Sequence, residues 1–270
     1  MTRLLARGLS CGYRGRPVLE GIDLSIEPGE LLALVGPNGA GKTTLFRALS
    51  GELVPSAGEA LVELDGVGTR ATALGRRERA RRMARVLQGE RPAWPASVRD
   101  YVAAGLFAGL GWFGVEGQNE QHAVEAALDR AGARAFAERR VTELSGGEFR
   151  RVLVARALAQ GADVLLLDEP VAELDLAGQM AVLDLLRDLA AHGSAVAFSV
   201  HDLNLAALAA DRVAALSSGR LVALGAPREV LTSELIESIY GSPVHVGEHP
   251  SADRLQISPI PPWLDRGEHI

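Results

Sequence analysis

Several residue types are scarce in this 270-residue sequence, and each scarcity excludes a class of protein. A single cysteine rules out an internal disulfide and favours a reducing compartment. Lysine occurs once, at position 42, among 28 basic residues, and the other basic residues are all arginine. The formal net charge is −6, so the chain lacks the positive excess typical of nucleic-acid-binding proteins, and we expect no nucleic-acid partner.

Long hydrophobic runs are also missing. The longest uncharged apolar stretch, 101–115, is interrupted by glycines and is too short for a membrane-spanning helix. Charged residues interrupt the first seven positions too early for a secretory signal peptide. Because 47% of the residues are hydrophobic, the chain still has enough apolar side chains for a packed core. We therefore expect a soluble protein, able to sit against a membrane, with one large domain or two small ones.

The sequence does contain an alternation of apolar strands and helices. Runs at Leu31–Val35, Val164–Leu167 and 195–200 are typical of strands that are covered on both faces. A helix is expected directly after the first run, at Lys42–Leu49. Another helix is expected between the second and third runs, marked by the apolar residues Leu176, Met180, Leu183 and Leu186. Such alternation predicts an α/β fold with right-handed crossovers and a parallel sheet.

The middle of the chain has a helical pattern and two unusual clusters. In the helical region 96–160, apolar residues recur at 3.6 spacing at Val124, Leu128 and Ala131. Aromatic residues are 4% of the chain, yet five gather here: Trp94, Tyr101, Phe107, Trp112 and Phe113. They indicate either a small helical core or a partner-binding surface. The arginine-rich run 70–91 indicates either a solvated helix face or contact with an acidic partner or anionic lipid.

The last part of the chain adds short elements to this pattern. Two further strands are expected at 213–216 and 221–224, on either side of a Ser-Gly turn. The segment after residue 243 is rich in proline and histidine and is expected to form a small appendage.

A glycine-rich segment between the first strand and its helix fits the pattern GxxxxGK[ST] of a phosphate-binding loop. It comprises Gly36, Pro37, Asn38, Gly39, Ala40, Gly41, Lys42 and Thr43. Glycines let successive backbone N–H groups point at one anion, and the N-terminus of the following helix adds positive potential. The lysine ammonium reaches the β- and γ-phosphates, and the threonine hydroxyl is suited to Mg²⁺. A planar guanidinium fits such a filled loop poorly, which gives one explanation for the single lysine.

Two other strand ends carry groups that suit nucleotide hydrolysis. The strand Val164–Leu167 is followed by Asp168 and Glu169, and the strand at 195–200 is followed by His201. The carboxyl ends of parallel strands meet at one edge of a sheet, where ligands bind. Asp168 is therefore a candidate Mg²⁺ ligand and Glu169 a candidate general base. A neutral His201 imidazole is suited to hydrogen-bond a γ-phosphate oxygen.

A second candidate anion site lies at 144–148, ahead of a helix. Ser145 is expected to cap that helix, with Glu148 completing a capping box. Gly146 and Gly147 leave backbone N–H groups open to an anion at the helix N-terminus. Because one nucleotide has no obvious use for both sites, we expect two chains to share each nucleotide.

In this order, the motifs resemble those of the ATP-binding subunits of ABC transporters, over nearly the whole chain. The resemblance implies a P-loop NTPase with a RecA-like parallel core, an N-terminal antiparallel β subdomain and an inserted helical subdomain at about 89–158. The ATPase domain would span 1–243 and the appendage 244–270. The implied cofactors are ATP and Mg²⁺, bound in a homodimer of ATPase subunits.

The same resemblance assigns roles to individual residues. Tyr13 would stack on adenine, and Thr44 would join Lys42 and Thr43 in binding phosphate and Mg²⁺. Gln88 would contact Mg²⁺ and the attacking water, and His201 would sense the γ-phosphate. The cross-dimer contacts would come from Ser145, Gly146 and Gly147, which would close over ATP in the opposite protomer, and from Asp175 on the dimer seam.

Within the family, the segments 201–206, 225–231 and 240–246 are similar to importers of metal chelates: ferric siderophores, haem and cobalamin. This resemblance implies integral-membrane permease subunits as partners, a substrate-binding protein as an indirect partner, and a place on the cytoplasmic face of the inner membrane. The alternatives are a soluble non-transport ABC ATPase and a subunit for another cargo. A simple P-loop kinase or GTPase would leave 144–148 unexplained.

Three positions depart from the family pattern. Glu148-Phe149 stands where glutamine is usual, and Leu87 stands where proline is common. Val171-Ala172-Glu173 replaces a Thr-Ser-Ala segment, so a serine hydroxyl expected to cross the dimer is absent. This last change puts the usual coupling between two ATP sites in question.

Overall fold

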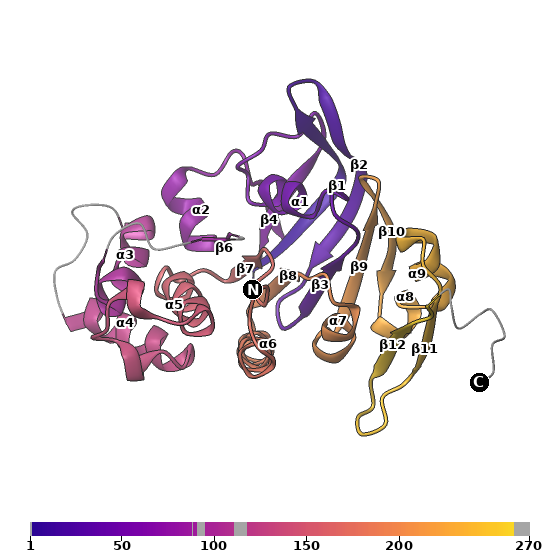
Figure 1. Ribbon diagram of the computed structural model, residues 1–270. Coiled ribbons are helices and arrows are strands. Elements are labelled where there is room, and N and C mark those ends of the chain that lie inside the picture. The colour runs from indigo at the N-terminus through magenta and orange to yellow at the C-terminus, as the bar shows by residue number, and fades with distance from the viewer. Residues whose placement is uncertain (1, 88, 91–94, 111–117, 262–270) are drawn as a thin grey trace.

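A computed structural model describes residues 2–87, 89–90, 95–110 and 118–261. The central feature of this part of the chain is a six-stranded sheet in the order β10-β9-β3-β8-β7-β6 (Figure 1). Its strands are β3 (Leu31–Val35), β6 (Met83–Val86), β7 (Val164–Leu167), β8 (Ala195–Ser199), β9 (Arg212–Ser217) and β10 (Arg220–Gly225). All neighbours pair in parallel except β10, which runs antiparallel to β9. The predicted parallel α/β sheet is thus confirmed.

Helices cross between these strands and bury both faces of the sheet. They are α1 (Lys42–Leu49), α6 (Leu176–Ala191) and α7 (Leu203–Ala209). Helix α2 (Arg76–Arg82) leads into β6 and has no buried residue. Alternate residues of β3 join different clusters, because side chains of a strand point to opposite faces. Leu31 and Ala33 pack in a cluster with α6, whereas Leu32 and Leu34 pack in a cluster with α1. Burial on both faces explains the uninterrupted apolar runs of these strands.

An antiparallel sheet covers the α1 side of the molecule. Its order is β2-β1-β4-β5, with β1 (Thr2–Tyr13), β2 (Arg16–Ile26), β4 (Ala57–Leu64) and β5 (Val67–Arg70). The register between β1 and β2 shifts at several points, where bulges bend the long strands. Apolar side chains of these strands pack in one cluster with α1 and with Ala40 of the segment before it, so the antiparallel sheet holds this segment and its helix in place.

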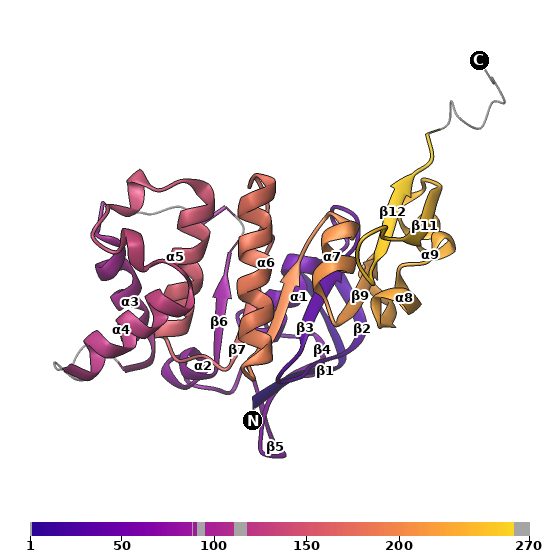
Figure 2. The ribbon, with the colours of Figure 1, turned by 90° about the horizontal axis from the view of Figure 1, so that it is seen from below.

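The helical region lies at one end of the central sheet in Figures 1 and 2. It contains α3 (Val98–Leu110), α4 (Gln118–Arg130), the 3₁₀ turns η1 (Arg134–Phe136) and η2 (Val141–Glu143), and α5 (Gly146–Ala159). Val124, Leu128 and Ala131 are buried together, as their spacing predicted. Trp94, Trp112 and Phe113 lie outside the described residues. Over the ranges described, none of the helices combines the length and apolar character needed to span a bilayer.

A C-terminal unit packs against the other end of the sheet (Figure 2). It consists of α8 (Pro227–Val230), α9 (Ser233–Tyr240) and a hairpin of β11 (Val244–Glu248) and β12 (Leu255–Pro259). The Asn204 amide in α7 donates to the Ile257 carbonyl and accepts from the Ile257 N–H, at 3.0 and 2.8 Å. Because the Ile257 side chain is also buried in the cluster that contains α6, the hairpin is fixed to the core.

The helix predicted from Leu176, Met180, Leu183 and Leu186 is confirmed as α6, although Leu176 itself is 72% exposed. Asp175 caps this helix, so Leu176 lies in its first turn. The buried face is formed further along by Val182, Leu183, Leu186 and Leu189.

Candidate functional site

The phosphate loop connects β3 to α1 with a backbone that requires glycine at two points. Gly36 has φ 146°, and a Cβ there would lie 2.2 Å from the Leu216 carbonyl oxygen. Gly41 has φ 106°, and a Cβ there would lie 2.6 Å from a methyl group of Leu19. Any side chain at either position would collide with its neighbours, so these glycines fix the path of the loop. Pro37 is partly buried and Ala40 is buried, whereas Asn38 and Gly39 form the exposed tip.

Lys42 is the first residue of α1, and its side chain folds back beneath the loop. Its Nζ donates to the carbonyl oxygens of Gly36 at 2.7 Å and Pro37 at 3.2 Å. Burial lowers the pKa of Lys42, while Glu169 and Asp168 act in the opposite direction. Thr44 is buried beside it, whereas Thr43 is exposed at the start of the helix, where its hydroxyl is open to a ligand.

The two carboxylates after β7 are held by a residue that sequence analysis missed. Ser199, fully buried in the neighbouring strand β8, donates its hydroxyl to Asp168 Oδ1 at 2.7 Å. The same Oγ accepts the backbone N–H of Glu169 at 2.9 Å. Glu169 has φ 51°, a left-handed conformation that is uncommon for a residue with a side chain. A hydroxyl inside an otherwise apolar strand was the available signal for Ser199.

His201 lies beside the second of these carboxylates. Its Nε2 is 2.5 Å from Glu169 Oε1, so the ends of β7 and β8 are joined by a side-chain hydrogen bond. A small cavity of about 160 Å³ borders both side chains. The structure therefore brings Lys42, Asp168, Glu169 and His201 to the same edge of the parallel sheet, as predicted.

The second anion site lies at the start of α5, with the predicted capping geometry. Ser145 Oγ accepts the Glu148 N–H at 3.3 Å, and Glu148 Oε2 accepts the Ser145 N–H at 2.8 Å. Arg139 pairs with Glu148 Oε1 at 2.8 Å, so the carboxylate found in place of the usual glutamine is neutralised. The Ser145 N–H, with help from Arg139, lowers the pKa of Glu148.

A hollow of about 540 Å³ at this helix is shared with the loop before α6. It is bordered by Ser145, Gly146, Gly147 and Asp175. The Asp175 carboxylate accepts the Gly178 N–H at 2.8 Å, so it caps α6 in addition to facing the hollow. Because α5 and α1 lie apart in both Figures 1 and 2, the two predicted anion sites are separate surfaces of one chain.

Of the remaining predicted residues, the structure describes Tyr13 but not Gln88. Tyr13 ends β1 and is 37% exposed. The Arg47 guanidinium lies 5.5 Å from the centre of its ring and donates to its hydroxyl at 3.3 Å, which places Tyr13 against the helix after the phosphate loop. Gln88 lies outside the described residues.

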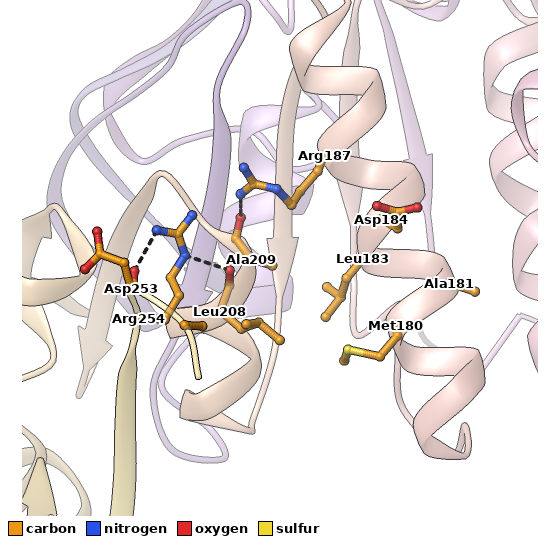
Figure 3. Close-up of a pocket in the computed structure, with 10 residues that line it drawn as sticks. Met180, Ala181, Leu183, Asp184, Arg187, Leu208, Ala209, Asp253 and Arg254 are labelled. Carbon is orange, nitrogen blue, oxygen red and sulfur yellow. Dashed lines mark hydrogen bonds between the residues drawn. The ribbon is translucent and has the colours of Figure 1, made fainter. Parts of the chain in front are cut away.

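A larger groove lies elsewhere and contains no predicted site residue. It has a volume of about 700 Å³ and lies between α6, α7 and the turn before β12 (Figure 3). Arg187 donates to the Ala209 carbonyl at 2.5 Å and Arg254 to the Leu208 carbonyl at 3.1 Å, so the groove's basic side chains are occupied by backbone oxygens. The groove therefore adds no group to the nucleotide chemistry.

Comparison with known proteins agrees with this geometry. The family model described as "ABC transporter" matches residues 19–172. The hemin import ATP-binding protein HmuV of Nocardia farcinica is 44% identical over 263 residues, which cover 95% of this chain and 89% of that protein. The cobalamin import ATP-binding protein BtuD of Halobacterium salinarum is 42% identical over 255 residues, or 94% of this chain. The chain spans 63% of the length of that cobalamin-import relative.

A solved structure extends the likeness to the whole fold. A protein described as a metal-chelate type ABC transporter in an inward-facing conformation superposes with a TM-score of 0.83 at 27% identity. The match covers 98% of this chain and 100% of that one. The chain belongs to the ABC transporter family, as one of its ATP-binding members.

Proposed function

We propose that the protein is the ATP-hydrolysing motor subunit of an ABC importer for a metal chelate. The observation that carries the proposal is the convergence of Lys42, Asp168, Glu169 and His201 at one edge of the parallel sheet, beside a glycine-constrained phosphate loop. The names of the relatives, which import hemin and cobalamin, support the class of cargo.

In this proposal the nucleotide binds along the phosphate loop. Backbone N–H groups of 36–41 and the start of α1 bind the phosphates, and Lys42 exchanges its carbonyl partners for phosphate oxygens. Thr44 supports the loop from its buried position, and Tyr13 stacks on adenine. Burial of the Lys42 ammonium strengthens its attraction to phosphate, because the local dielectric is low.

The residues also fit a magnesium ion shared with the phosphates. Mg²⁺ is held by one or two carboxylates together with waters and phosphate oxygens, and Asp168 is a buried carboxylate with its orientation fixed by Ser199. Thr43, Gln88 and Asp168 are the proposed ligands. When bound, Mg²⁺ offsets the negative charge that develops on the phosphates.

Hydrolysis in this proposal depends on Glu169 as the general base. The hydrogen bond to His201 orients the carboxylate, and the Ser199 contact to the Glu169 N–H fixes the strained turn from which it projects. Glu169 takes a proton from the attacking water, which Gln88 helps to position, while His201 contacts the γ-phosphate.

We further propose that two copies bind two ATP molecules between them. Ser145, Gly146 and Gly147 lie apart from the phosphate loop of their own chain, which supports the proposal that they contact ATP on a partner, with Asp175 at the seam. Light scattering of Glu169→Gln with Mg·ATP tests this arrangement, since bound ATP then persists. We expect twice the monomer mass, reverting when EDTA removes Mg²⁺. A mass that stays monomeric at saturating ATP would refute the shared site.

The proposed partners are membrane permease subunits and, through them, a substrate-binding protein. The helical subdomain at about 89–158 is the proposed permease contact, on the cytoplasmic face of the inner membrane. Tyr101 of the aromatic cluster is buried and belongs to the core of this subdomain. The test is co-expression with a metal-chelate permease of the same organism and reconstitution into vesicles with a substrate-binding protein. ATPase activity should rise with the transported chelate among haem, a ferric siderophore and cobalamin.

Glu169→Gln in the same vesicles is the control, because it keeps the assembly and removes hydrolysis. ATPase activity without any co-purifying polytopic membrane protein would favour a non-transport ABC ATPase. If a different binding protein and cargo stimulated the ATPase activity, the assignment as a motor subunit would stand and the proposed substrate would change.

A further inference from the structure

Helix α5 is attached by polar side chains to the segment 80–90, which leads into and out of strand β6. The Arg150 guanidinium donates to the Leu87 carbonyl at 3.3 Å, and the Arg156 guanidinium donates to the Glu90 carboxylate at 2.5 Å. At the end of the helix, the Gln160 amide donates to the Met83 carbonyl at 2.9 Å and also to the Ala80 carbonyl. The helix that begins with Gly146 and Gly147 therefore contacts this segment along its length.

Arg156 is the centre of a partly buried contact that also includes Tyr101. Its second nitrogen donates to the Tyr101 hydroxyl at 2.7 Å, and the guanidinium carbon lies 4.9 Å from the centre of the Tyr101 ring. The Tyr101 hydroxyl in turn lies 3.3 Å from the same Glu90 oxygen. Tyr101 is 4% exposed, and burial raises its pKa to about 12, so it stays a neutral donor at any physiological pH.

The same contact fixes α3 to α5. Tyr101 lies on α3 and packs its ring 5.8 Å from that of Phe149. A Cβ at Gly105, one turn further along α3, would lie 2.3 Å from the Arg156 carbonyl oxygen. The two helix backbones thus approach too closely for a side chain, and α3 and α5 are expected to move as one body.

At its other end, the segment reaches the proposed magnesium ligand. The Asp168 N–H donates to the Val86 carbonyl at 2.9 Å, as a continuation of the parallel pairing between β6 and β7. Val86 precedes Leu87, which Arg150 holds. Asp168 is therefore linked to α5 by a hydrogen bond to Val86, the peptide bond from Val86 to Leu87, and the hydrogen bond from Arg150 to Leu87. Arg156 holds the same segment a second time at Glu90.

From this chain of contacts we infer that Arg156, Glu90 and Tyr101 are positioning residues for ATP hydrolysis. They hold the segment that flanks position 88 in a fixed place relative to the helix that starts at Gly146. This inference rests on the proposed ATPase function. Loss of the contact displaces the segment beside Asp168 without removing any group that touches nucleotide, so it lowers the turnover number and leaves ATP affinity nearly unchanged.

The test uses the full chain and six variants: Glu90→Gln, Tyr101→Phe, Arg156→Lys, the single reversals Glu90→Arg and Arg156→Glu, and the charge swap that combines the two reversals. Equilibrium binding of a fluorescent ATP analogue gives affinity and the number of sites per chain. Phosphate release, expressed per binding site, gives the turnover number. Because misfolded protein binds no ATP, expressing the rate per binding site removes its contribution. A purely structural role would change the number of sites per chain and leave the rate per site unchanged.

We expect Glu90→Gln to lower the turnover number per site by about ten- to a hundredfold, because small misplacements in active sites have effects of that size. ATP affinity should stay within about twofold. Arg156→Lys keeps the positive charge but loses the planar guanidinium that contacts Glu90 and Tyr101 together, so its effect should be smaller than that of Glu90→Gln. The charge swap should recover part of the activity that either single reversal loses.

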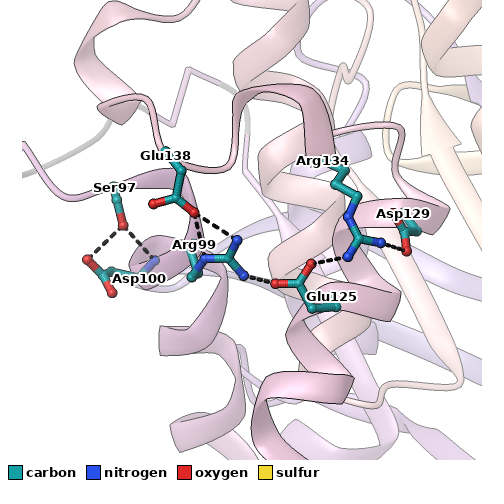
Figure 4. Close-up of polar contacts among 7 residues, drawn as sticks. All are labelled: Ser97, Arg99, Asp100, Glu125, Asp129, Arg134 and Glu138. Atoms are coloured by element: carbon teal, nitrogen blue, oxygen red, sulfur yellow. Dashed lines mark hydrogen bonds and ion pairs between the residues drawn. The ribbon is translucent and has the colours of Figure 1, made fainter.

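The matched control is Arg99→Gln in the same helical region. Arg99 pairs with Glu138 at 2.8 Å and with Glu125, and its side chain is 40% exposed (Figure 4). This ion pair touches neither the segment 80–90 nor α5, so the turnover number should equal that of the parent.

The outcomes separate this inference from the proposed function. Turnover per site within twofold of the parent in both Glu90→Gln and Arg156→Lys would overturn the inference and leave the ATPase assignment intact. An equal loss in Arg99→Gln would also overturn it, because the effect would then reflect general destabilisation. A parent chain that binds but never hydrolyses ATP would overturn the proposed function itself, and the inference with it.

Discussion

The edge of the central sheet and the helical region place their polar groups by different means. At the sheet edge, loop glycines, strand ends and one buried hydroxyl orient the groups. Asp168, Glu169 and His201 follow a strand end by one or two residues, and Lys42 is the first residue of the helix after the loop. In the helical region, arginines reach across tens of residues to carboxylates and carbonyls. The topology of the parallel strands sets the first arrangement. The second depends on individual side-chain contacts between residues far apart in the sequence.

This difference has an energetic side. Lys42, Asp168 and Ser199 are almost fully buried, so a hydrogen bond lost there leaves a polar atom without solvent, whereas the side chain of His201 is 46% exposed. The arginine contacts range from enclosed, as at Arg156, to exposed, as at Arg99. We expect substitutions to have effects in the same order: largest at the sheet edge, smaller in the enclosed arginine contact, and smallest in the exposed pair.

The largest effect is expected from Glu169→Gln at the sheet edge. The amide keeps the shape of the side chain but cannot accept a proton from water, so hydrolysis should fall by about 10²–10⁴. ATP binding should remain, since no phosphate contact is removed. Single-turnover phosphate release and equilibrium ATP binding measure the two separately. Asp184→Asn, on the exposed face of α6, is the control. Hydrolysis at the parent rate would show that Glu169 is not the base.

The next largest effect should come from Ser199→Ala, one strand away. The change removes the donor to Asp168 and the acceptor for the Glu169 N–H in a site with no solvent. We expect a loss of about 1–3 kcal/mol in the free energy of unfolding, measured with urea. The concentration of Mg²⁺ needed for tight ATP binding should also rise.

Ser217→Ala, at the partly exposed end of β9, is the matched control for this variant and should change neither quantity. An unfolding free energy equal to that of the parent would mean that Asp168 finds another partner. In that case the buried hydroxyl has no positioning role.

Ser199 also shows what the sequence does and does not predict. The strands, the phosphate loop and the cap of α5 were predictable, because apolar runs and capping residues are local signals. Ser199 and Asp168 are 31 residues apart, and Arg156 and Glu90 are 66 apart, so neither contact has a local signature. Helical periodicity predicted α6, but it did not show that Leu176 in the first turn would be exposed. The structure brings Lys42, Asp168, Glu169 and His201 together and has Ser145, Gly146, Gly147 and Asp175 on a separate surface. The catalytic roles of these residues remain predictions.

A third effect is expected from Lys42→Arg, which keeps the charge in the phosphate loop. Lys42 is 6% exposed, and its ammonium already lies between two carbonyls of the loop. A planar guanidinium needs more room than this space provides. ATP affinity should fall by about tenfold or more, which corresponds to about 1.4 kcal/mol. Arg7→Lys, exposed on β1, should leave affinity unchanged. Unchanged ATP binding in a titration of Lys42→Arg would remove the geometric reason for the single lysine.

The smallest effect is expected from Arg99→Gln, in the exposed pairs of Figure 4. Of its two partners, Glu138 is 78% exposed and Glu125 is 24% exposed, so water reaches all of these charges once the ion pairs separate. The loss in unfolding free energy should be about 0.2–1 kcal/mol at low salt. It should shrink further near 1 M salt, where the screening length is about 3 Å.

Urea unfolding of Arg99→Gln and of Arg156→Lys at low and high salt then separates exposed from enclosed contacts. The Arg156 contact is shielded from ions by Tyr101, so its contribution should persist when salt is added. If both variants lost the same free energy and both losses vanished at high salt, burial would not distinguish the two arginines. The helical region would then be held by its apolar core alone, and Arg156 would have no special part in fixing α5 to the sheet edge.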